Sequence, residues 1–499
     1  MNRTNTHKYI ARIIMESITP MFVGSGESSL LKDALVQKDF QGLPMIPGTA
    51  LAGVLRHSIL DQYNKSDLKN YTQEQLNEYF SLLDLFGAQF NKKSKTEKEL
   101  FENWYKKNRS HKSNIPDGLG SRLKISSAYF LLPNNEVAED LFVKIDESLK
   151  MRLTNLPIRK HVKINDKGVA NSNGLFDNEI VPKGAKFVFE VELSGSKEDH
   201  NIWEKIIEEL KSPVFKVGQG TRKGYGRLKV EKIFNKTFHL EKDFESYLNF
   251  DPSFNSVLNF DNVENVSNNS YLTYKLSLEP DNFFIFSEGF GDNEVDNKPL
   301  VEEVIKYTPS EILFEEQTVI PASSIKGAIS HRVAFHYNKS TGKYADTITD
   351  SPENYLGDNN EAVSILFGNK GDIGSKKKSG KRGIVVFDDL FYDDIDNSKI
   401  INHVAIDRFT GGAINGALFS EKVSYSNNKS IELSIYITNP SVDSLIQAAL
   451  EESLKDICKG LLPLGGMSTK GHGMFTGELR KNHEVIFTYK NVNSHGINK

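Results

Sequence analysis

The chain contains an internal duplication, and this repeat constrains its possible folds more than any other feature. Residues 44–56 (PMIPGTALAGVLR) return at 318–330 as TVIPASSIKGAIS, with Pro47 and Pro321 in register. In both copies apolar residues follow at i, i+4 and i+8, which predicts a helix with one buried face. The repeat therefore predicts two copies of one domain, fused in tandem.

Length, charge and cysteine content limit the class of protein. A chain of 499 residues is too long for one ordinary core and fits two domains. Its net charge of -4 excludes a generally basic nucleic-acid binder, so any such partner must be held by local patches. Cys458 is the only cysteine, which excludes an internal disulfide and favours a cytoplasmic location. The sequence begins without an apolar signal segment and has no run of membrane-helix length, so we expect no membrane association.

Each half can be divided into the same succession of elements. A strand, a glycine-containing loop and the repeated helix come first, and a second strand follows a Leu-Phe-Gly helix stop. An alternating strand, a helix, a glycine-rich loop and a last strand complete each half. The order strand, helix, strand, strand, helix, strand predicts an α+β chain of two ferredoxin-like (RRM-like) domains. The predicted boundaries are 1–235 for the first domain, 236–270 for a linker and 271–499 for the second domain.

Three basic, polar insertions interrupt this pattern, at 91–112, 159–178 and 369–382. Taken alone, such segments are more often solvated loops than binding sites.

The glycine-rich loops at 218–226 and 465–473 are the clearest candidates for binding. Glycines at this spacing let the backbone approach a phosphate, and Arg222, Lys223 and Lys470 add positive charge. One such run is weak evidence, but two at matching places are stronger. Neither is a P-loop, because no Gly-x-x-x-x-Gly-Lys-Ser/Thr occurs.

These motifs, in their duplicated order, resemble the RAMP superfamily (repeat-associated mysterious proteins). The resemblance rests on the Ile-Pro-Gly-Thr-x-Leu-x-Gly helix, the Gly-Leu-Phe of 174–176 with its counterpart in 416–419, and the terminal glycine loops. It covers both halves without the linker, the insertions and the last residues. It is closest to the backbone subunits of type III CRISPR effector complexes, some of which are double-domain proteins.

The resemblance implies partners and an activity. Such subunits bind a guide CRISPR RNA beside other type III effector subunits, and a β-hairpin thumb in each domain enters the duplex with complementary target RNA. Catalytic members carry one Asp ahead of the Ile-Pro motif and cut target RNA with Mg²⁺ or another divalent cation.

Asp33 is the residue that matches this catalytic position. A carboxylate can take the proton of a ribose 2′-hydroxyl or hold the metal that does so. Without the resemblance, Asp33 would be interpreted as a solvated loop residue. Aligning the first glycine loops of the two halves, Gly24-x-Gly26 and Gly289-x-Gly291, places Lys298 opposite Asp33, with Asp292 and Asp296 nearby. We therefore predict that the second domain binds RNA but cuts poorly or not at all.

The resemblance also suggests RNA-binding residues. Its Ser-x-Lys-Gly motif is intact at Ser324 and Lys326, whereas the first half has Ala50 and Ala52 there, so Arg56 would compensate one turn later. The predicted set is Arg56, His161, Lys163, Gly218, Gly220, Arg222, Lys223, Ser324, Lys326, Arg408, Gly466 and Lys470.

Two other functions are also compatible with the sequence. The chain could be a structural RNA-binding scaffold in which neither domain cuts, and then Asp33 would be dispensable. It could also be an endonuclease that processes the guide precursor. Such enzymes commonly use a histidine near the start, and the chain offers His7 and His57.

Overall fold

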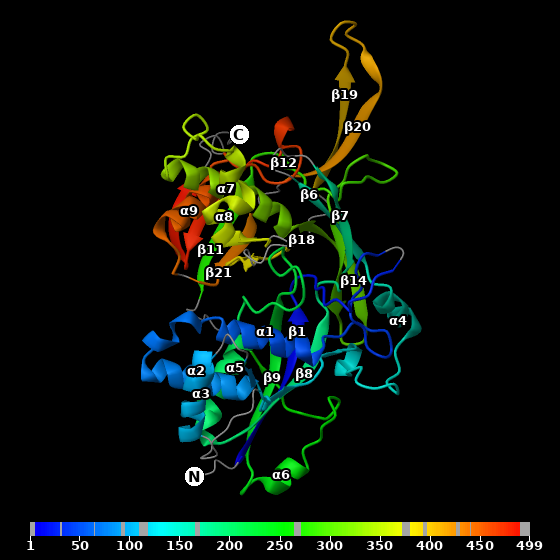
Figure 1. Cartoon of the computed structure of the whole chain (residues 1–499). Coiled ribbons are helices and arrows are strands. Elements are labelled where there is room, and N and C mark those ends of the chain that lie inside the picture. Colours follow the sequence, from blue (N-terminus) through cyan, green and yellow to red (C-terminus); the bar gives the residue numbers. More distant parts are fainter. Residues whose placement is uncertain are drawn as a thin grey trace.

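The computed structural model describes residues 5–29, 32–63, 65–90, 95–108, 118–164, 170–263, 271–371, 380–392, 397–425, 430–439 and 441–489. The chain forms two stacked halves, each built around its own hydrophobic core (Figure 1). Within these ranges, no helix is long and apolar enough to cross a membrane.

The first domain is built on an antiparallel sheet in the order β10-β9-β1-β8-β4. Its central strand β1 (His7–Ser17) is rich in Ile and Tyr, residues that favour a pleated, buried surface. It pairs with β8 (Lys186–Gly195) and β9 (Leu228–His239), while β4 (Leu123–Ile125) and β10 (Asp261–Asn262) form the edges.

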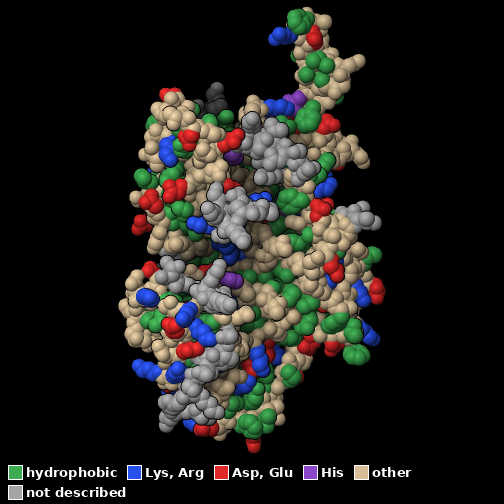
Figure 2. Space-filling view, viewed as in Figure 1, with side chains coloured by type: hydrophobic (Ala, Val, Ile, Leu, Met, Phe, Trp, Pro, Cys, Tyr) green, Lys and Arg blue, Asp and Glu red, His purple; other side chains and the backbone are tan. Residues whose placement is uncertain are grey.

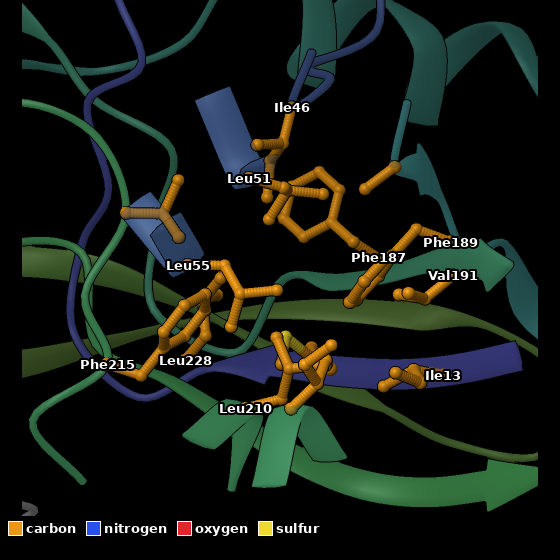
Figure 3. Packing of buried hydrophobic residues seen from close by; sticks show 14 of the residues in the cluster. Ile13, Ile46, Leu51, Leu55, Phe187, Phe189, Val191, Leu210, Phe215 and Leu228 are labelled. Carbon is orange, nitrogen blue, oxygen red and sulfur yellow. The ribbon is translucent and has the colours of Figure 1, made fainter. Parts of the chain in front are cut away.

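Helices α1 (Gly48–Leu60) and α5 (His200–Leu210) pack against this sheet. Leu51 and Leu55 project from one side of α1, as the i, i+4 pattern predicts, and Leu210 projects from α5 toward the same strands (Figure 3). Both α1 leucines are at most 1% exposed, so cutting either back to alanine would cost about 2–5 kcal/mol.

The second domain repeats this plan with the sheet order β17-β21-β11-β22-β23. The strands are β11 (Leu272–Pro280), β17 (Val385–Phe387), β21 (Ile431–Ile437), β22 (Phe475–Lys481) and β23 (Glu484–Tyr489). Helices α7 (Ala322–Ser340) and α9 (Ser444–Cys458) cover it. In both domains the four core strands lie in the order fourth, first, third, second, so each half is a βαββαβ unit of the expected α+β type.

A long hairpin leaves each domain. The first thumb consists of β6 (Ile158–Ile164) and β7 (Ala170–Glu179), and the second of β19 (Ser398–Ile406) and β20 (Ala413–Tyr425). The second thumb projects far beyond the body, whereas the first runs up toward the second domain (Figure 1).

The first thumb is tied to the second domain by a buried ion-pair cluster. Arg159 on β6 is 4% exposed, and its guanidinium pairs with Glu302 and Asp389. Glu302 lies on β13 (Val301–Tyr307), which pairs with β14 (Ile312–Ile320). The sequence did not predict this β13–β14 hairpin.

A close backbone contact also joins the domains. The N–H of Ile305 donates to the carbonyl of Lys183 at 2.7 Å. Gly184 (φ +89°) follows, and a Cβ there would lie 1.9 Å from the carbonyl oxygen of Ile305. Only glycine allows the second domain to approach this closely.

Two predicted irregular segments are ordered instead. Helices α2 (Gln73–Phe86) and α3 (Lys95–Asn108) precede β4, and α3 occupies the insertion predicted as a polar loop. Phe101 and Trp104 are buried on α3, a spacing that its many lysines and glutamates obscure. The described part of the predicted linker, up to Val263, packs on the first domain through α6 (Phe244–Leu248) and β10.

The remaining short elements connect these parts. They are η1 (Lys65–Asn70), β2 (Ala88–Gln89), β3 (Gly118–Leu119), β5 (Tyr129–Phe130), η2 (Pro133–Asn135), α4 (Glu147–Thr154), η3 (Lys197–Asp199), β12 (Phe283–Phe284), η4 (Pro352–Tyr355), η5 (Gly357–Asn359), α8 (Glu361–Phe367), β15 (Gly368–Asn369), β16 (Lys381–Arg382), β18 (Leu390–Tyr392) and η6 (Ser468–Lys470).

Candidate nucleic-acid interface and cleavage site

Asp33 lies exposed in the loop between β1 and α1, where it is bound to the first thumb. Its backbone N–H donates to a carboxylate oxygen of Asp177 at 2.8 Å, and the N–H of Asp177 donates to Asp33 Oδ2 at 3.0 Å. Two carboxylates therefore meet at this place. The sequence did not predict Asp177, although it lies in the insertion 159–178, because nothing local indicates its partner.

Glu179 on β7 anchors the Asp33 loop through hydrogen bonds to residues on both sides of Asp33. Its buried carboxylate accepts hydrogen bonds from Lys32 Nζ at 2.8 Å, from the N–H of Val36 at 2.9 Å and from Lys38 Nζ at 3.1 Å. Burial opposes the ionisation of Glu179, but these donors outweigh it and lower its pKa. Since the donors flank Asp33 on both sides, its position is fixed by the fold.

Backbone contacts place Asp296, and not Lys298, at the corresponding point of the second domain. The N–H of Ser420 on β20 donates to Asp296 Oδ2 at 2.8 Å, as the N–H of Asp177 does to Asp33. The residue after each aspartate shows the same correspondence. The carbonyl of Ala34 accepts from the N–H of Glu179 at 3.1 Å, and the carbonyl of Asn297 accepts from the N–H of Lys422 at 2.8 Å.

The first glycine loops agree with this alignment. Ser25 N–H donates to the carbonyl of Leu35 at 3.0 Å, and Glu288 N–H donates to that of Lys298 at 3.2 Å. Lys298 is therefore the counterpart of Leu35. The sequence alignment, based on Gly-x-Gly, was displaced by two positions.

The second site nevertheless differs in chemistry from the first. Ser420 stands where the first thumb has Asp177, and its hydroxyl donates to Asp296 at 3.0 Å. Asp292 instead accepts from the N–H groups of Glu294 and Val295 within its own turn, at 2.9 and 3.2 Å, and these bonds lower its pKa. One carboxylate thus remains at the second site.

The residues of the first site could bind a magnesium ion that is also coordinated by the substrate. Mg²⁺ is commonly bound by one or two carboxylates, with waters and substrate phosphates completing the shell. Asp33 and Asp177 supply such a pair. Among the residues that the structure describes, no group of three or more His, Cys, Asp or Glu side chains is arranged to hold a metal by itself.

Cations from both domains gather where the two halves meet (Figure 2). Burial and the charge of Arg382 lower the pKa of Arg222 to about 9, and burial and Lys370 lower that of Lys223. Burial, Lys223 and Arg222 lower the pKa of Lys326 on α7. We call these five residues the junction cluster. An anion bound here would relieve their mutual repulsion, and Arg222 Nε, which is buried and has no hydrogen-bond partner in the described part of the chain, could donate to it.

Each thumb contacts the glycine loop of its own domain in the same way. Lys223 Nζ lies 4.8 Å from the ring centroid of Phe176, and Lys470 Nζ lies 5.2 Å from that of Phe419. His161 Nε2 is 2.7 Å from the Tyr225 hydroxyl. Burial, with Arg159 and then Lys223, lowers the pKa of His161 to about 4, so its imidazole is neutral at pH 7. His161 is thus half-buried, and its hydrogen bond to Tyr225 joins the first thumb to the glycine loop of 218–226.

The second thumb is joined to its glycine loop by a different set of side chains. His403 Nε2 and His472 Nε2 lie 2.6 and 3.1 Å from the same oxygen of Glu421, a carboxylate that is fully buried.

The glycines of the first loop are required by the fold itself. A Cβ on Gly218 would lie 2.3 Å from the carbonyl oxygen of Phe22, and one on Gly220 would lie 2.6 Å from the Tyr225 ring. Gly466 has no such constraint, since a Cβ there would make only ordinary contacts at 3.7 Å. The basic side chains, more than the glycines, therefore carry the prediction of phosphate binding.

The other predicted binding residues are spread over the molecule. Arg56 is half-buried on α1, Ser324 is exposed at the start of α7, and Lys326 Nζ donates to the carbonyl of Phe367 at 3.2 Å. Arg408 is exposed near the tip of the second thumb. Lys163 lies on β6, and its side chain falls outside the described part of the chain. The structure thus brings together Arg222, Lys223 and Lys326, whereas Arg408 and Lys470 belong to the second thumb and its loop.

Two βαββαβ domains, each with a thumb and a glycine loop and with cations gathered at their junction, define a class of tandem RNA-binding proteins. The sequence model of the RAMP superfamily matches residues 14–229 and 302–476, one segment in each half, and the chain belongs to this superfamily. RAMP proteins bind CRISPR RNA within Cas complexes, and membership implies an RNA-binding role of this kind. A search of curated proteins found no match to the chain.

Proposed function

We propose that the chain is a guide-RNA-binding backbone subunit of a type III CRISPR effector complex and cleaves complementary target RNA from its first domain. The observation that carries this proposal is the position of Asp33, exposed and held beside Asp177 at the base of the first thumb. The partners are guide CRISPR RNA, complementary target RNA and other type III effector subunits. The junction cluster would hold RNA phosphates through attraction between opposite charges.

The cleavage chemistry follows from the two carboxylates. Asp33 or Asp177 would take the proton of a ribose 2′-hydroxyl, whose oxygen attacks the adjacent phosphorus and displaces the 5′-oxygen of the next nucleotide. A bound divalent cation would supply positive charge that stabilises the phosphorane-like transition state. Backbone N–H groups hold both carboxylates in place, so they need no rearrangement when target RNA arrives.

The test uses the effector complex assembled with its guide RNA, end-labelled complementary target RNA and Mg²⁺. We expect Asp33→Asn to remove one cut while target binding persists, and Asp177→Asn to slow that cut and raise the Mg²⁺ concentration it requires. Asp140→Asn is the matched control, because Asp140 is also exposed and accepts from a backbone N–H in a turn of the first domain. Identical products from wild type and Asp33→Asn would refute cleavage by this domain.

The second domain is proposed to bind RNA and to cut more slowly than the first. Asp296 has the geometry of Asp33 but lacks the second carboxylate, so its hold on a cation is weaker. In the same assay, any slower second cut should disappear in Asp296→Asn and persist in Asp33→Asn.

A scaffold that does not cut is the second candidate. It is favoured by the absence, among the described side chains, of three metal-ligating groups in one place. In that case wild type and Asp33→Asn complexes would both bind target RNA and leave it intact.

A further inference from the structure

An aromatic residue of the second domain lies next to the first-domain site. Lys160 on β6 is directly opposite Asp177 in the register of the first thumb. Its ammonium lies 4.5 Å from the ring centroid of Phe290, in the first glycine loop of the second domain, between Gly289 and Gly291. Phe290 thus contacts Lys160, the cross-strand neighbour of Asp177, which is hydrogen-bonded to Asp33.

Both sides of this contact are held in place. Arg159, the neighbour of Lys160, is buried between Glu302 and Asp389 of the second domain, which fixes β6 against that domain. The Phe290 loop is closed by its own contacts, since the N–H of Gly289 donates to Ser287 Oγ at 2.8 Å. Gly291 lies so near its own loop that a Cβ would meet the carbonyl oxygen of Val295 at 1.8 Å.

Phe290 remains accessible although it is held in position. It is 54% exposed, which leaves a large aromatic surface in water beside Lys160. An exposed phenylalanine on a loop is not unusual in itself. Here, however, the ring adjoins a proposed RNA site, and unstacked bases of single strands bind to aromatic rings in that setting.

The two domains differ at this position. The backbone alignment that matches Asp33 with Asp296 also matches Gly26 with Gly289, both at positive φ, so Glu27 is the counterpart of Phe290. A carboxylate cannot stack with a base and repels phosphate. The aromatic ring is therefore specific to the loop that faces the first thumb.

We propose that Phe290, together with Lys160, forms a stacking platform for a base of the target strand beside Asp33, so that the second domain completes the cleavage site of the first. The inference rests on the proposed function of Asp33. Phe290 is a positioning residue: it holds the nucleotide so that its 2′-hydroxyl reaches the carboxylates. Lys160 would attract the adjacent phosphate.

The test measures single-turnover cleavage by the assembled complex and the fluorescence of 2-aminopurine placed next to the cut in the target. We expect Phe290→Leu to slow the Asp33-dependent cut about tenfold, as loss of one base–aromatic stack predicts, while pairing with the guide still holds the target. The 2-aminopurine signal should rise as stacking is lost. Phe290→Trp should restore both the rate and the quenching.

Phe244→Leu serves as the matched control, because Phe244 is 53% exposed and lies on α6, remote from the thumb (Figure 1). If Asp33→Asn removes the cut but Phe290→Leu cuts at the wild-type rate, this inference is wrong and the proposed function stands. If Phe290→Leu is slow and Phe290→Trp does not recover, the role is structural and the stacking platform is refuted. If Asp33→Asn cuts normally, the proposed function and the positioning role of Phe290 both fail.

Discussion

His161 shows how neighbouring charges decide what a single residue does. It is flanked by Arg159 and Lys223, and burial together with these cations lowers its pKa from 6.5 to about 4. Between these two values the unfolded chain binds a proton that the folded chain does not, so the free energy of unfolding falls as the pH drops through this window. We expect His161→Gln to remove this part of the pH dependence, measured as urea midpoints at pH 7 and pH 5. His57→Gln, whose side chain is 68% exposed, is the control, and equal pH dependence in wild type and His161→Gln would contradict the argument.

Single positions also show how far the sequence could predict the candidate site. Asp33 could be predicted because the spacing to the Ile-Pro motif is local. Asp177 could not, because a hydrogen bond between residues 144 positions apart leaves no local signal. Lys298 was placed opposite Asp33 because two Gly-x-Gly runs look alike in sequence. The backbone instead pairs Gly26 with Gly289, the two glycines that adopt positive φ.

At the level of elements, the first thumb and the second domain are joined by Arg159. Asp389 is buried and the Glu302 side chain is only 9% exposed, so Arg159→Met would remove the cation with which both carboxylates pair. We expect this substitution to lower the free energy of unfolding by about 3–5 kcal/mol. Arg152→Met provides the control, because its pair with Glu303 is exposed and is worth about 0–1 kcal/mol. Thermal denaturation of both variants measures the difference, and similar midpoints would show that the cluster does not stabilise the junction.

The same elements explain which parts of the fold the sequence could predict. The βαββαβ order was predictable, since α1 and α7 carry apolar residues every four positions. Helix α3 was not, because its buried residues Phe101 and Trp104 stand among many charged residues. The β13–β14 hairpin was not predictable either, since much of its length is polar and its burial depends on the first domain, as at Ile305.

At the scale of the whole molecule, charge is distributed unevenly. The chain carries a net charge of -4, yet at the junction burial and the nearby charges of Lys223 and Arg222 lower the pKa of Lys326. Repulsion of this kind lowers the stability of the free protein and favours the bound state with an anion. In the proposed function, the free protein is thus less stable at the junction, and binding of RNA phosphates there removes the repulsion.

This repulsion predicts that one substitution raises the stability of the free chain and lowers its affinity for guide RNA. We expect Arg222→Gln to raise the thermal midpoint of the free chain, because it removes one of several repelling charges. The same variant should bind guide RNA more weakly. The negative slope of log affinity against log salt concentration should become shallower by about 0.7 for each lost contact with a single strand.

Lys124→Gln is the control, because the Lys124 side chain is 73% exposed and its loss should change neither quantity. Fluorescence anisotropy with labelled guide RNA at several salt concentrations, beside thermal denaturation, measures both. An unchanged slope would show that Arg222 does not contact phosphate, and a lowered midpoint would show that the junction cluster stabilises the fold instead of straining it.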